Sequence, residues 1–213
     1  MAQPFDADLL LEAEALACIR DDRVLFEGLG FRLGNGELLM LEGRNGSGKT
    51  SLLRILCSIR LADAGEVRWC GTEIQRLGPD YHLQLSYVGH RDGIKQDLTP
   101  EENLRMARAL GAPNPATGVL DALEHFGLRG FEDVPTRTLS AGQQRRVALA
   151  RLVATEAPLW ILDEPFTSLD RHGIGVFESV MAAHLDRGGM IVMTTHHRVA
   201  LEGERVHRIN LSP

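Results

Sequence analysis

The sequence predicts an α/β fold with a mostly parallel sheet, an N-terminal antiparallel β part and an inserted helical lobe. Apolar runs at 159–162 and 190–193 are separated by a helical pattern, which is the spacing of strand–helix–strand units in parallel sheets. The first third of the chain instead has strand and turn patterns, whereas residues 92–149 are mainly helical. We therefore predict one domain of 213 residues, with a core of residues 1–91 and 150–213 and a lobe of residues 92–149.

The composition is that of an ordinary globular protein. Its 213 residues, 44% hydrophobic and 24% charged, can bury one substantial core. Charges break the longest apolar stretches before the roughly 20 residues of a membrane-spanning helix, and the acidic start lacks the basic region of a secretion signal. We therefore expect a cytoplasmic protein. Because the formal net charge is -6, we expect no nucleic-acid partner.

The cysteines give no sign of a disulfide framework or a zinc site. Cys18, Cys57 and Cys70 are odd in number and have no CxxC spacing. We predict that all three are small core residues.

A strand, a loop and a helix are predicted in the first third of the chain. Phe31 and Leu33 alternate with polar residues or glycine, and the Asn-Gly pair at 35–36 predicts a hairpin turn before an apolar strand at 37–41. That strand runs into glycines. The following helix, at 51–59, would pack on the sheet through Leu52, Leu53, Ile55, Leu56 and Ile59.

The middle of the chain begins with strands and continues with helices. We predict a hairpin at 65–74 and a buried strand at 83–89. Thr99, Pro100 and Glu102 form a capping pattern for a helix that Gly111 would end. A second helix follows and ends at Gly127. After the lobe we predict a helix at 171–186, between the two apolar strands, and an edge strand at 204–211.

Residues 43–50, GRNGSGKT, match the phosphate-loop pattern GxxxxGK[ST] and lie between the predicted strand and helix. Glycines allow consecutive backbone amides to face phosphate oxygens beside a helix N-terminus. Lys49 would bridge the β- and γ-phosphates, and the Thr50 hydroxyl would face Mg²⁺. This motif predicts a P-loop NTPase that binds ATP with Mg²⁺. The predicted nucleotide contacts are Gly43, Arg44, Asn45, Gly46, Ser47, Gly48, Lys49, Thr50 and Ser51.

Residues 159–164, LWILDE, predict a buried strand that ends in two carboxylates at the carboxyl edge of the sheet. Asp163 would hold Mg²⁺, usually through water, and Glu164 would orient and deprotonate the attacking water. Taken alone, two acids at a strand end can simply face solvent. Their occurrence together with GRNGSGKT favours the catalytic interpretation.

Residues 139–143, LSAGQ, resemble the LSGGQ signature of the ABC ATPases, with Ala141 in place of the first glycine. Ser140 and the amides near Gly142 would form an anion site at a helix N-terminus. Alone, the motif could be a simple serine N-cap. Its position between the phosphate loop and the acidic strand end favours the resemblance.

Further residues follow the order of motifs in that family. Ser168, Leu169 and Asp170 resemble the D-loop after the catalytic glutamate, and His196 resembles the switch histidine that contacts the γ-phosphate. A lone histidine at a strand end is more often a surface residue, but its place after the second apolar strand favours the switch role. Three arginines in the helix predicted after LSAGQ are expected on a solvated or domain-contacting face rather than in a nucleic-acid patch. They are Arg145, Arg146 and Arg151.

The resemblance to ABC ATPases covers residues 9–211 and implies an ATPase with a RecA-like core. It also implies a head-to-tail homodimer, in which the phosphate loop of one subunit and LSAGQ of the other enclose each ATP. Glu164 would act as the base, while Lys49 and His196 stabilise charge on the phosphoryl group. The residues implied to serve the partner's nucleotide are Ser140, Ala141, Gly142 and Gln143, and Asp170 of the D-loop is also implied to contact nucleotide.

Two longer segments resemble a narrower group, the ATP-binding subunits of the cytochrome c maturation (haem exporter) systems. They are SYVGHRDGIKQDLTPEENL and GLRGFEDVPTRTLSAGQQRRVALARL. His90 stands where most ABC ATPases have the Q-loop glutamine, and it could contact nucleotide or Mg²⁺, although imidazole is a weaker ligand for a hard metal.

This narrower resemblance implies integral membrane transporter subunits as partners, docked on the lobe near 92–135. It also implies a peripheral position on the cytoplasmic face of the bacterial inner membrane. The work driven would be haem export or delivery, or release of a haem-loaded chaperone.

One departure and several alternatives stay open. The family's base-stacking aromatic is replaced by the segment 19–22, IRDD, in which Arg20 could stack on the base instead, so the preference for adenine is undecided. The chain could serve another ABC importer or exporter. A soluble ABC protein acting on nucleic acid or ribosomes would usually carry a coiled-coil, zinc or tandem-domain insertion, and a P-loop kinase would have no use for LSAGQ.

Overall fold

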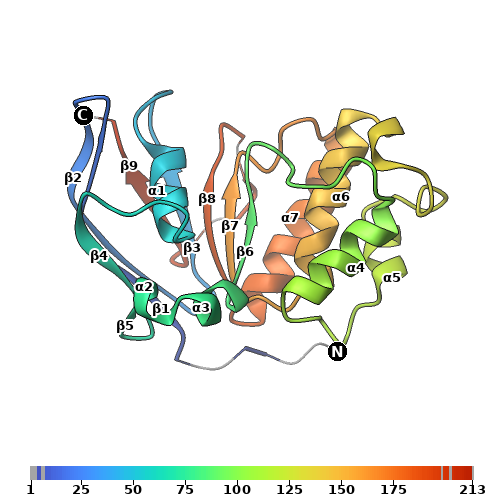
Figure 1. Cartoon of the computed structure of the whole chain (residues 1–213), viewed down its shortest axis with the longest axis horizontal. Helices are drawn as coiled ribbons and strands as arrows, with labels where there is room; N and C mark the ends of the chain where they lie inside the picture. The colour runs from blue at the N-terminus through green and yellow to red at the C-terminus, as the bar shows by residue number, and fades with distance from the viewer. Residues whose placement is uncertain (1–3, 6–7, 198, 202, 213) are drawn as a thin grey trace.

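The chain folds around two β-sheets, with helices between and beside them (Figure 1). The structure, a computed structural model, describes residues 4–5, 8–197, 199–201 and 203–212. The antiparallel sheet has the order β2-β1-β4-β5. Its strands are β1 (Leu10–Arg20), β2 (Arg23–Gly34), β4 (Ala64–Trp69) and β5 (Thr72–Glu73).

The second sheet is parallel and has the order β6-β7-β8-β3-β9. Its strands are β3 (Leu38–Glu42), β6 (Leu85–Val88), β7 (Leu159–Asp163), β8 (Met190–Thr194) and β9 (Val206–Asn210). The predicted fold class, a mostly parallel α/β core with an antiparallel β part, is confirmed. The strand predicted near the C-terminus is β9, at one edge of this sheet.

Helix α1 lies between the two sheets, and the larger helices α4, α6 and α7 lie on the other side of the parallel sheet (Figure 1). The helices are α1 (Lys49–Leu56), α2 (Ile74–Leu77), α3 (Pro79–Leu83), α4 (Pro100–Leu110), α5 (Val119–His125), the 3-10 helix η1 (Thr136–Thr138), α6 (Ala141–Ala154) and α7 (Arg171–Asp186). Among the residues that the structure describes, no helix is long and apolar enough to cross a membrane.

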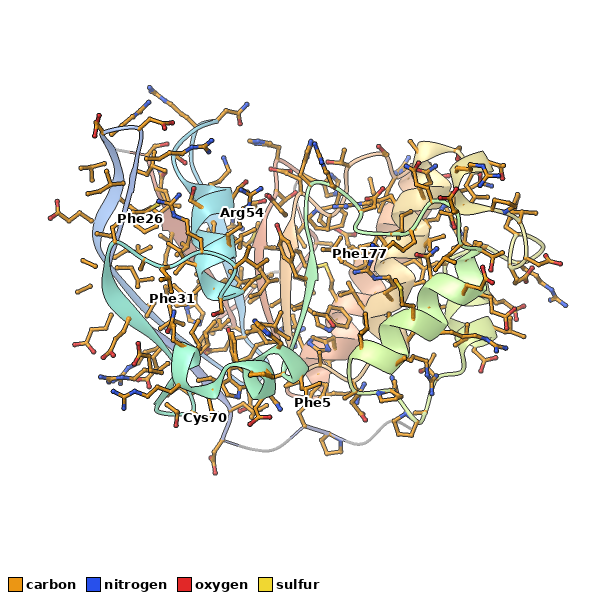
Figure 2. The ribbon with its side chains drawn as sticks, viewed as in Figure 1. Phe5, Phe26, Phe31, Arg54, Cys70 and Phe177 are labelled. Atoms are coloured by element: carbon orange, nitrogen blue, oxygen red, sulfur yellow. The ribbon has the colours of Figure 1, made fainter. Side chains whose placement is uncertain are left out.

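The three central strands of the parallel sheet, β3, β7 and β8, are buried on both faces, whereas the edge strands β6 and β9 are partly exposed. The alternation of side chains along the central strands divides the core in two. Leu39, Ile161 and Val192 pack toward α1 and the antiparallel sheet. Met40 and Leu162, their neighbours in sequence, pack toward α6 and α7 on the other face, where Phe177 also lies (Figure 2). Side chains alternate with a period of two along a strand, so one apolar strand can serve both clusters.

The two capping motifs at the start of α4 and α6 form as hydrogen-bonded boxes. The Glu102 amide donates to Thr99 Oγ1 at 3.2 Å, and the Thr99 amide donates to Glu102 Oε2 at 2.8 Å. Ser140 and Gln143 make the same reciprocal pair before α6. Gly111 follows the last residue of α4, as predicted. These boxes satisfy backbone donors that a helix start otherwise leaves unpaired.

The hairpin predicted at Asn35 and Gly36 is wrong. The turn exists, with Gly36 at φ +74°, but it connects two different sheets. Strand β2 pairs with β1, whereas β3 lies between β8 and β9. A hairpin strand with one solvated face would alternate in polarity, but Leu38 to Leu41 are all buried, which suits a central parallel strand.

Three smaller predictions fail at the ends of elements. Ile59 is 62% exposed because α1 ends at Leu56, before the apolar pattern does. Leu83 is the last residue of α3, so the predicted strand begins only at Leu85. Cys70 is exposed in the turn between β4 and β5 (Figure 2), whereas the other two cysteines are buried as predicted.

Helices α4, α5 and α6 pack on one another beside the β6 edge of the parallel sheet (Figure 1). Helix α6 crosses the predicted end of the lobe, since it runs to Ala154. We retain the division into a core and a lobe at residues 92–149 as a proposal.

Candidate functional site

The phosphate loop joins β3 to α1, as the sequence predicts. Lys49 Nζ donates to the backbone oxygens of Gly43 at 2.6 Å and Arg44 at 3.2 Å, which holds the ammonium group over the loop. Gly48 has φ +101°, and a Cβ there would lie 3.0 Å from the Phe26 ring. The loop therefore needs glycine at this position both for its backbone angle and for space.

Ser47 lies inside this loop and has a buried hydroxyl oxygen without a hydrogen-bond partner among the described residues. A Cβ on Gly43 would lie 2.6 Å from that oxygen. Buried polar atoms in folded proteins nearly always have a partner, and an anion in the loop would supply one. The observation fits a phosphate group at this loop.

Three oxygen-bearing side chains meet beside the loop. Thr50 Oγ1 donates to Asp163 Oδ2 at 2.9 Å, and Thr194 Oγ1 donates to Asp163 Oδ1 at 2.8 Å. Asp163 ends β7 and pairs in register with Thr194 of β8, so neighbouring parallel strands deliver both groups to one edge. Asp163 is 4% exposed, and its two hydroxyl partners compensate for the burial of its carboxylate.

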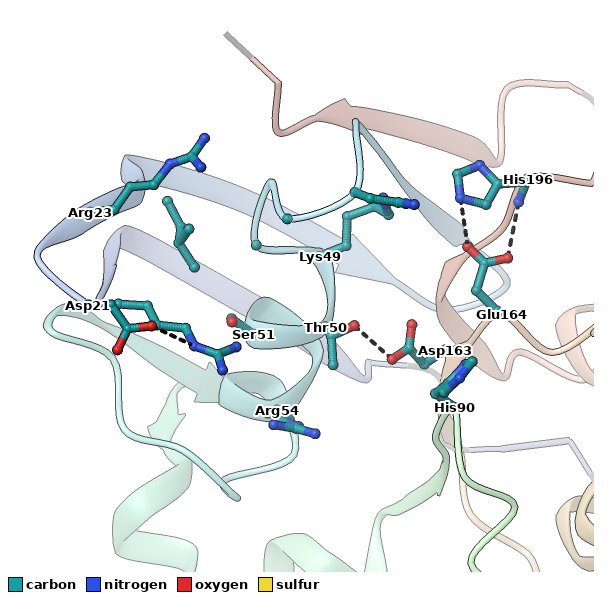
Figure 3. Close-up of a pocket in the computed structure, with 15 residues that line it drawn as sticks. Asp21, Arg23, Lys49, Thr50, Ser51, Arg54, His90, Asp163, Glu164 and His196 are labelled. Atoms are coloured by element: carbon teal, nitrogen blue, oxygen red, sulfur yellow. Dashed lines mark hydrogen bonds and ion pairs between the residues drawn. The ribbon is translucent and has the colours of Figure 1, made fainter.

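Glu164 follows the strand and faces His196. Its Oε1 lies 3.4 Å from His196 Nε2, and its Oε2 accepts a hydrogen bond of 3.2 Å from the His196 amide (Figure 3). Glu164 has φ +50°, a left-handed backbone that a residue with a side chain adopts at a cost of about 1–3 kcal/mol. The Glu164 carboxylate is thus held in a fixed direction at the rim of the site.

These groups line one open cleft of about 660 Å³ (Figure 3). The predicted site residues found in its lining are Asn45, Gly46, Gly48, Lys49, Thr50, Ser51, His90, Asp163, Glu164 and His196. The phosphate loop and the acidic strand end, 113 residues apart at Thr50 and Asp163, therefore form a single site.

The cleft offers oxygen ligands suited to Mg²⁺. Mg²⁺ in nucleotide sites is typically held by one or two protein oxygens together with substrate phosphates and water. Thr50 and Asp163 supply a hydroxyl and a carboxylate in contact with each other. Among the described residues, no three His, Cys, Asp or Glu side chains are grouped so that they could hold a metal ion. The donor set fits Mg²⁺ that arrives with a nucleotide.

Several predicted residues lie outside the lining of the cleft. Ser140 caps α6, and Asp170 Oδ1 caps α7 by accepting a bond of 2.7 Å from the Gly173 amide. Gly142 packs against the segment before α7, since a Cβ there would lie 2.7 Å from the Ser168 carbonyl oxygen. The predicted residues that do not line the cleft are Gly43, Arg44, Ser47, Ser140, Ala141, Gly142, Gln143 and Asp170.

Cys57, just beyond the C-terminal end of α1, takes no part in this chemistry. Burial raises the pKa of its thiol far above the usual value, and the nearby Asp163 raises it further. The thiol therefore stays neutral and is no nucleophile.

The outer part of the cleft, beyond the phosphate loop, is lined by charged residues. Arg20 and Asp21 form an exposed ion pair of 3.5 Å, and Arg23, Leu25 and Arg54 lie in the same lining (Figure 3). The sequence drew attention to Arg20 but missed Arg23 and Arg54. Arg20 and Arg23 lie three residues apart at the place of the missing aromatic, and this proximity is the signal that could have identified Arg23.

Two residues important for the geometry were also missed. Thr194 directly follows the apolar run predicted at 190–193 and was given no role, although a hydroxyl at the end of a buried strand is a sign of a polar function. Arg145 is buried, 3% exposed, and is not on a solvated face. It instead contacts the segments that follow β6 and β7, which agrees with the domain-contacting alternative.

Comparisons with known proteins agree with this geometry. Residues 26–167 match the family model described as ABC transporter. A protein of Methylococcus capsulatus named "Cytochrome c biogenesis ATP-binding export protein CcmA" is 50% identical over 97% of this chain and 100% of its own length. A protein of the same name from Pseudomonas savastanoi pv. phaseolicola is 52% identical over 89% of both chains.

Solved structures give the same fold. A structure described as the ATP-binding subunit of an ABC transporter superimposes with a TM-score of 0.81 at 26% identity, over 88% of this chain and 79% of that one. An ATP-binding protein of a putative ABC transporter from Pyrococcus furiosus gives 0.79 at 21% identity, over 95% and 97%, which supports the fold alone. From its motifs, its cleft and these relatives, the chain belongs to the ABC transporter family of ATP-binding subunits, within the group of cytochrome c biogenesis export proteins called CcmA.

Proposed function

We propose that this chain binds and hydrolyses ATP to energise a membrane export complex that serves c-type cytochrome biogenesis. The observation that carries the proposal is the contact between the phosphate loop and the acidic strand end, where Thr50 and Asp163 are 2.9 Å apart. Phosphate-binding and water-activating groups thereby face one cleft, as hydrolysis of a nucleoside triphosphate requires.

Within this cleft each side chain has a proposed task. The loop amides and Lys49 bind the β- and γ-phosphates. Glu164 orients the attacking water and accepts its proton, because its carboxylate is fixed at the rim of the cleft. His196 lies 3.4 Å from Glu164 and stabilises charge on the γ-phosphate.

Mg²⁺, when bound with ATP, neutralises charge on the phosphate oxygens. Thr50 and Asp163 are the residues proposed to hold it. Thr194 keeps the Asp163 carboxylate turned toward the cleft through its bond of 2.8 Å. His90 also lines the cleft and is proposed to contact water or phosphate there, since imidazole suits a hydrogen bond better than direct bonding to a hard cation.

The active form is proposed to be a head-to-tail homodimer. One chain supplies phosphate-binding and water-activating groups, but Ser140 and Asp170 lie outside the lining of its own cleft. Ser140 caps α6, a helix of 14 residues, and the exposed N-terminus of this helix can accept an anion from another subunit. We propose that the segment Ser140–Gln143 closes the nucleotide site of the neighbour.

A membrane subunit is proposed to dock beside the helical lobe. A groove of about 260 Å³ lies between the segment of α3 and β6 and the helices α4 and α6. Leu110, 75% exposed, and Leu83 line it and offer apolar contact. Gly93, which follows the His90 loop, lines the same groove, so a partner seated there would touch the loop that reaches the cleft.

The pathway is inferred from the relatives, which are named for cytochrome c biogenesis and export. We propose that the subunit acts at the cytoplasmic face of the bacterial inner membrane, bound to integral transporter subunits. The work driven is the export or delivery of haem, or the release of a haem-loaded chaperone.

A complementation experiment tests this pathway. A strain that lacks the gene receives the wild-type chain, Glu164→Gln, or the control Glu27→Gln, an exposed carboxylate outside the cleft. We expect wild type and the control to restore covalent haem on c-type cytochromes, measured by haem staining of gels, and Glu164→Gln to leave it absent. Normal staining in the deletion strain would reject the pathway.

A further inference from the structure

Arg145 lies in the second turn of α6, five residues after Ser140, and each of its guanidinium N–H groups can be assigned an acceptor. The side chain is 3% exposed. Its hydrogen bonds run from Nε to Pro165 O at 3.0 Å, from Nη1 to Gly89 O at 3.0 Å and Asp92 Oδ1 at 2.8 Å, and from Nη2 to Asp163 O at 3.2 Å and Glu164 O at 2.8 Å. An arginine has five donors, and all five are used.

The five acceptors belong to two segments that border the nucleotide cleft. One is the end of β7 and the turn after it, residues 163–165. The other is the loop after β6, residues 89–92, which includes His90. Because the guanidinium is planar and rigid, it fixes the distance and orientation between these two segments. The same side chain belongs to α6, the helix that Ser140 caps.

The contact with Glu164 falls at a strained point of the backbone. Glu164 has φ +50°, and both its backbone amide and its carbonyl oxygen are fixed by hydrogen bonds. Its amide donates to Thr194 O at 3.2 Å and Thr194 Oγ1 at 3.0 Å, while its carbonyl oxygen accepts from Arg145 at 2.8 Å. A strained left-handed conformation persists only where neighbouring contacts enforce it. Because the hydrogen bond from Arg145 is one of these contacts, Arg145 helps to fix the Glu164 backbone and thereby the orientation of its carboxylate.

The charge of Arg145 makes this arrangement sensitive to the 89–92 loop. Asp92, whose side chain is 25% exposed, is the carboxylate that neutralises the buried guanidinium. A shift of this loop would remove a charged partner from a buried cation, which is unfavourable unless the cation moves too. Arg151 holds the same loop through Asp92 O and Gly93 O but makes no hydrogen bond to residues 163–165.

We propose that Arg145 is a positioning residue for ATP hydrolysis, which couples the position of the 89–92 loop to the orientation of the Glu164 carboxylate. The inference rests on the proposed function, in which Glu164 activates water. It assigns to Arg145 no contact with ATP. Its loss should therefore slow turnover and leave nucleotide affinity nearly unchanged.

Steady-state hydrolysis by the purified full chain tests the proposal with three variants. Arg145→Gln keeps a polar side chain but loses most of the donors, and Arg145→Lys keeps the charge without the planar fork. We expect kcat to fall about tenfold or more in both, as small misplacements of catalytic groups do. KM for ATP should stay within about twofold, since binding contacts are intact. Arg146→Gln is the matched control on the same helix. Among the described residues, Arg146 makes no hydrogen bond to residues 89–92 or 163–165, so this variant should retain nearly the wild-type kcat.

Asp92→Asn provides a second route if Arg145 variants do not fold. It leaves Arg145 in place and removes only the charge of its partner, and we expect kcat to fall about threefold at unchanged KM. Wild-type kcat in folded Arg145→Gln, or in Asp92→Asn where the first does not fold, would overturn the proposal. If Glu164→Gln also hydrolysed ATP at the wild-type rate, the proposed function would fail as well, so the two failures are distinguishable.

Discussion

Thr194 Oγ1 donates a hydrogen bond of 2.8 Å to Asp163 Oδ1, and the same oxygen accepts one of 3.0 Å from the Glu164 amide. Thr194 is fully buried at the end of β8. One hydroxyl thus joins the carboxylate proposed to hold Mg²⁺ to the backbone of the proposed base.

Replacement of Thr194 by valine, which has the same shape, should separate this polar role from packing. The Asp163 carboxylate would lose a buried donor, which costs about 1–3 kcal/mol in the free energy of unfolding. Hydrolysis should fall as well. The neighbouring Thr195→Val serves as the control, because the one hydrogen bond of the Thr195 hydroxyl within the described residues is accepted from the His197 amide, near the surface. Chemical denaturation and a phosphate-release assay measure both effects. Equal stability of the two variants would contradict this role of Thr194.

The variant Glu164→Gln should bind ATP and fail to hydrolyse it. The amide keeps the size of the side chain but cannot accept a proton from water, so we expect turnover to fall about a hundredfold or more. ATP should then accumulate in a stable dimer, visible as an earlier peak in gel filtration. Unchanged steady-state hydrolysis would exclude Glu164 as the base.

Nucleotide selectivity should be weak. The outer cleft offers Arg20, Arg23 and Arg54 in place of an aromatic ring, and guanidinium groups stack on either purine. A site without a dedicated hydrogen bond to the base discriminates poorly, so KM for GTP should lie within about tenfold of that for ATP. Competition between the two nucleotides measures the ratio. Rejection of GTP by a much larger factor would indicate base contacts that these residues do not supply.

The stability of the protein should depend on pH through His184, whose ring stacks on Trp160 at 3.7 Å between centroids. Burial lowers the pKa of His184 to about 3. Below its ordinary pKa near 6.5, the unfolded chain binds a proton that the folded chain does not. The free energy of unfolding therefore decreases as pH falls from 6.5 toward the folded-state pKa of about 3, by up to about 1.4 kcal/mol per pH unit.

His184→Gln removes this titration and should give a shallower pH dependence between pH 6.5 and 5. Denaturant unfolding of both proteins at several pH values provides the comparison, and the control is the free energy difference at pH 8, where both forms are neutral. Identical slopes for the two proteins would contradict the assignment to His184.

The sequence predicted well which motifs meet in the cleft, because each motif constrains its own local geometry. The phosphate loop and the acidic strand end each contain their own chemical signal, and parallel strands bring their carboxyl ends to one edge. Capping pairs such as Thr99 and Glu102 are equally local. For these features, a few neighbouring residues determine the structure.

The failed predictions depend on contacts that are distant in sequence. Asn35 and Gly36 form a turn whether the next strand pairs with the previous one or enters another sheet, and only the burial of β3 decides this. For Arg145 the sequence predicts a solvated or a domain-contacting face but does not identify the segments that it contacts. Its acceptors lie between 18 and 56 residues away, and no local pattern predicts five of them around one guanidinium.

The central claim is that each ATP is held between two copies of the chain, and mixing of two inactive variants tests it most directly. Lys49→Ala damages the phosphate loop, whereas Ser140→Arg damages the segment proposed to close the neighbour's site. Each homodimer has two damaged sites and should be inactive. A mixed dimer has one intact site and one with both defects, so an equal mixture should recover about a quarter of wild-type hydrolysis. No recovery on mixing, with each variant folded and dimeric, would contradict the shared site.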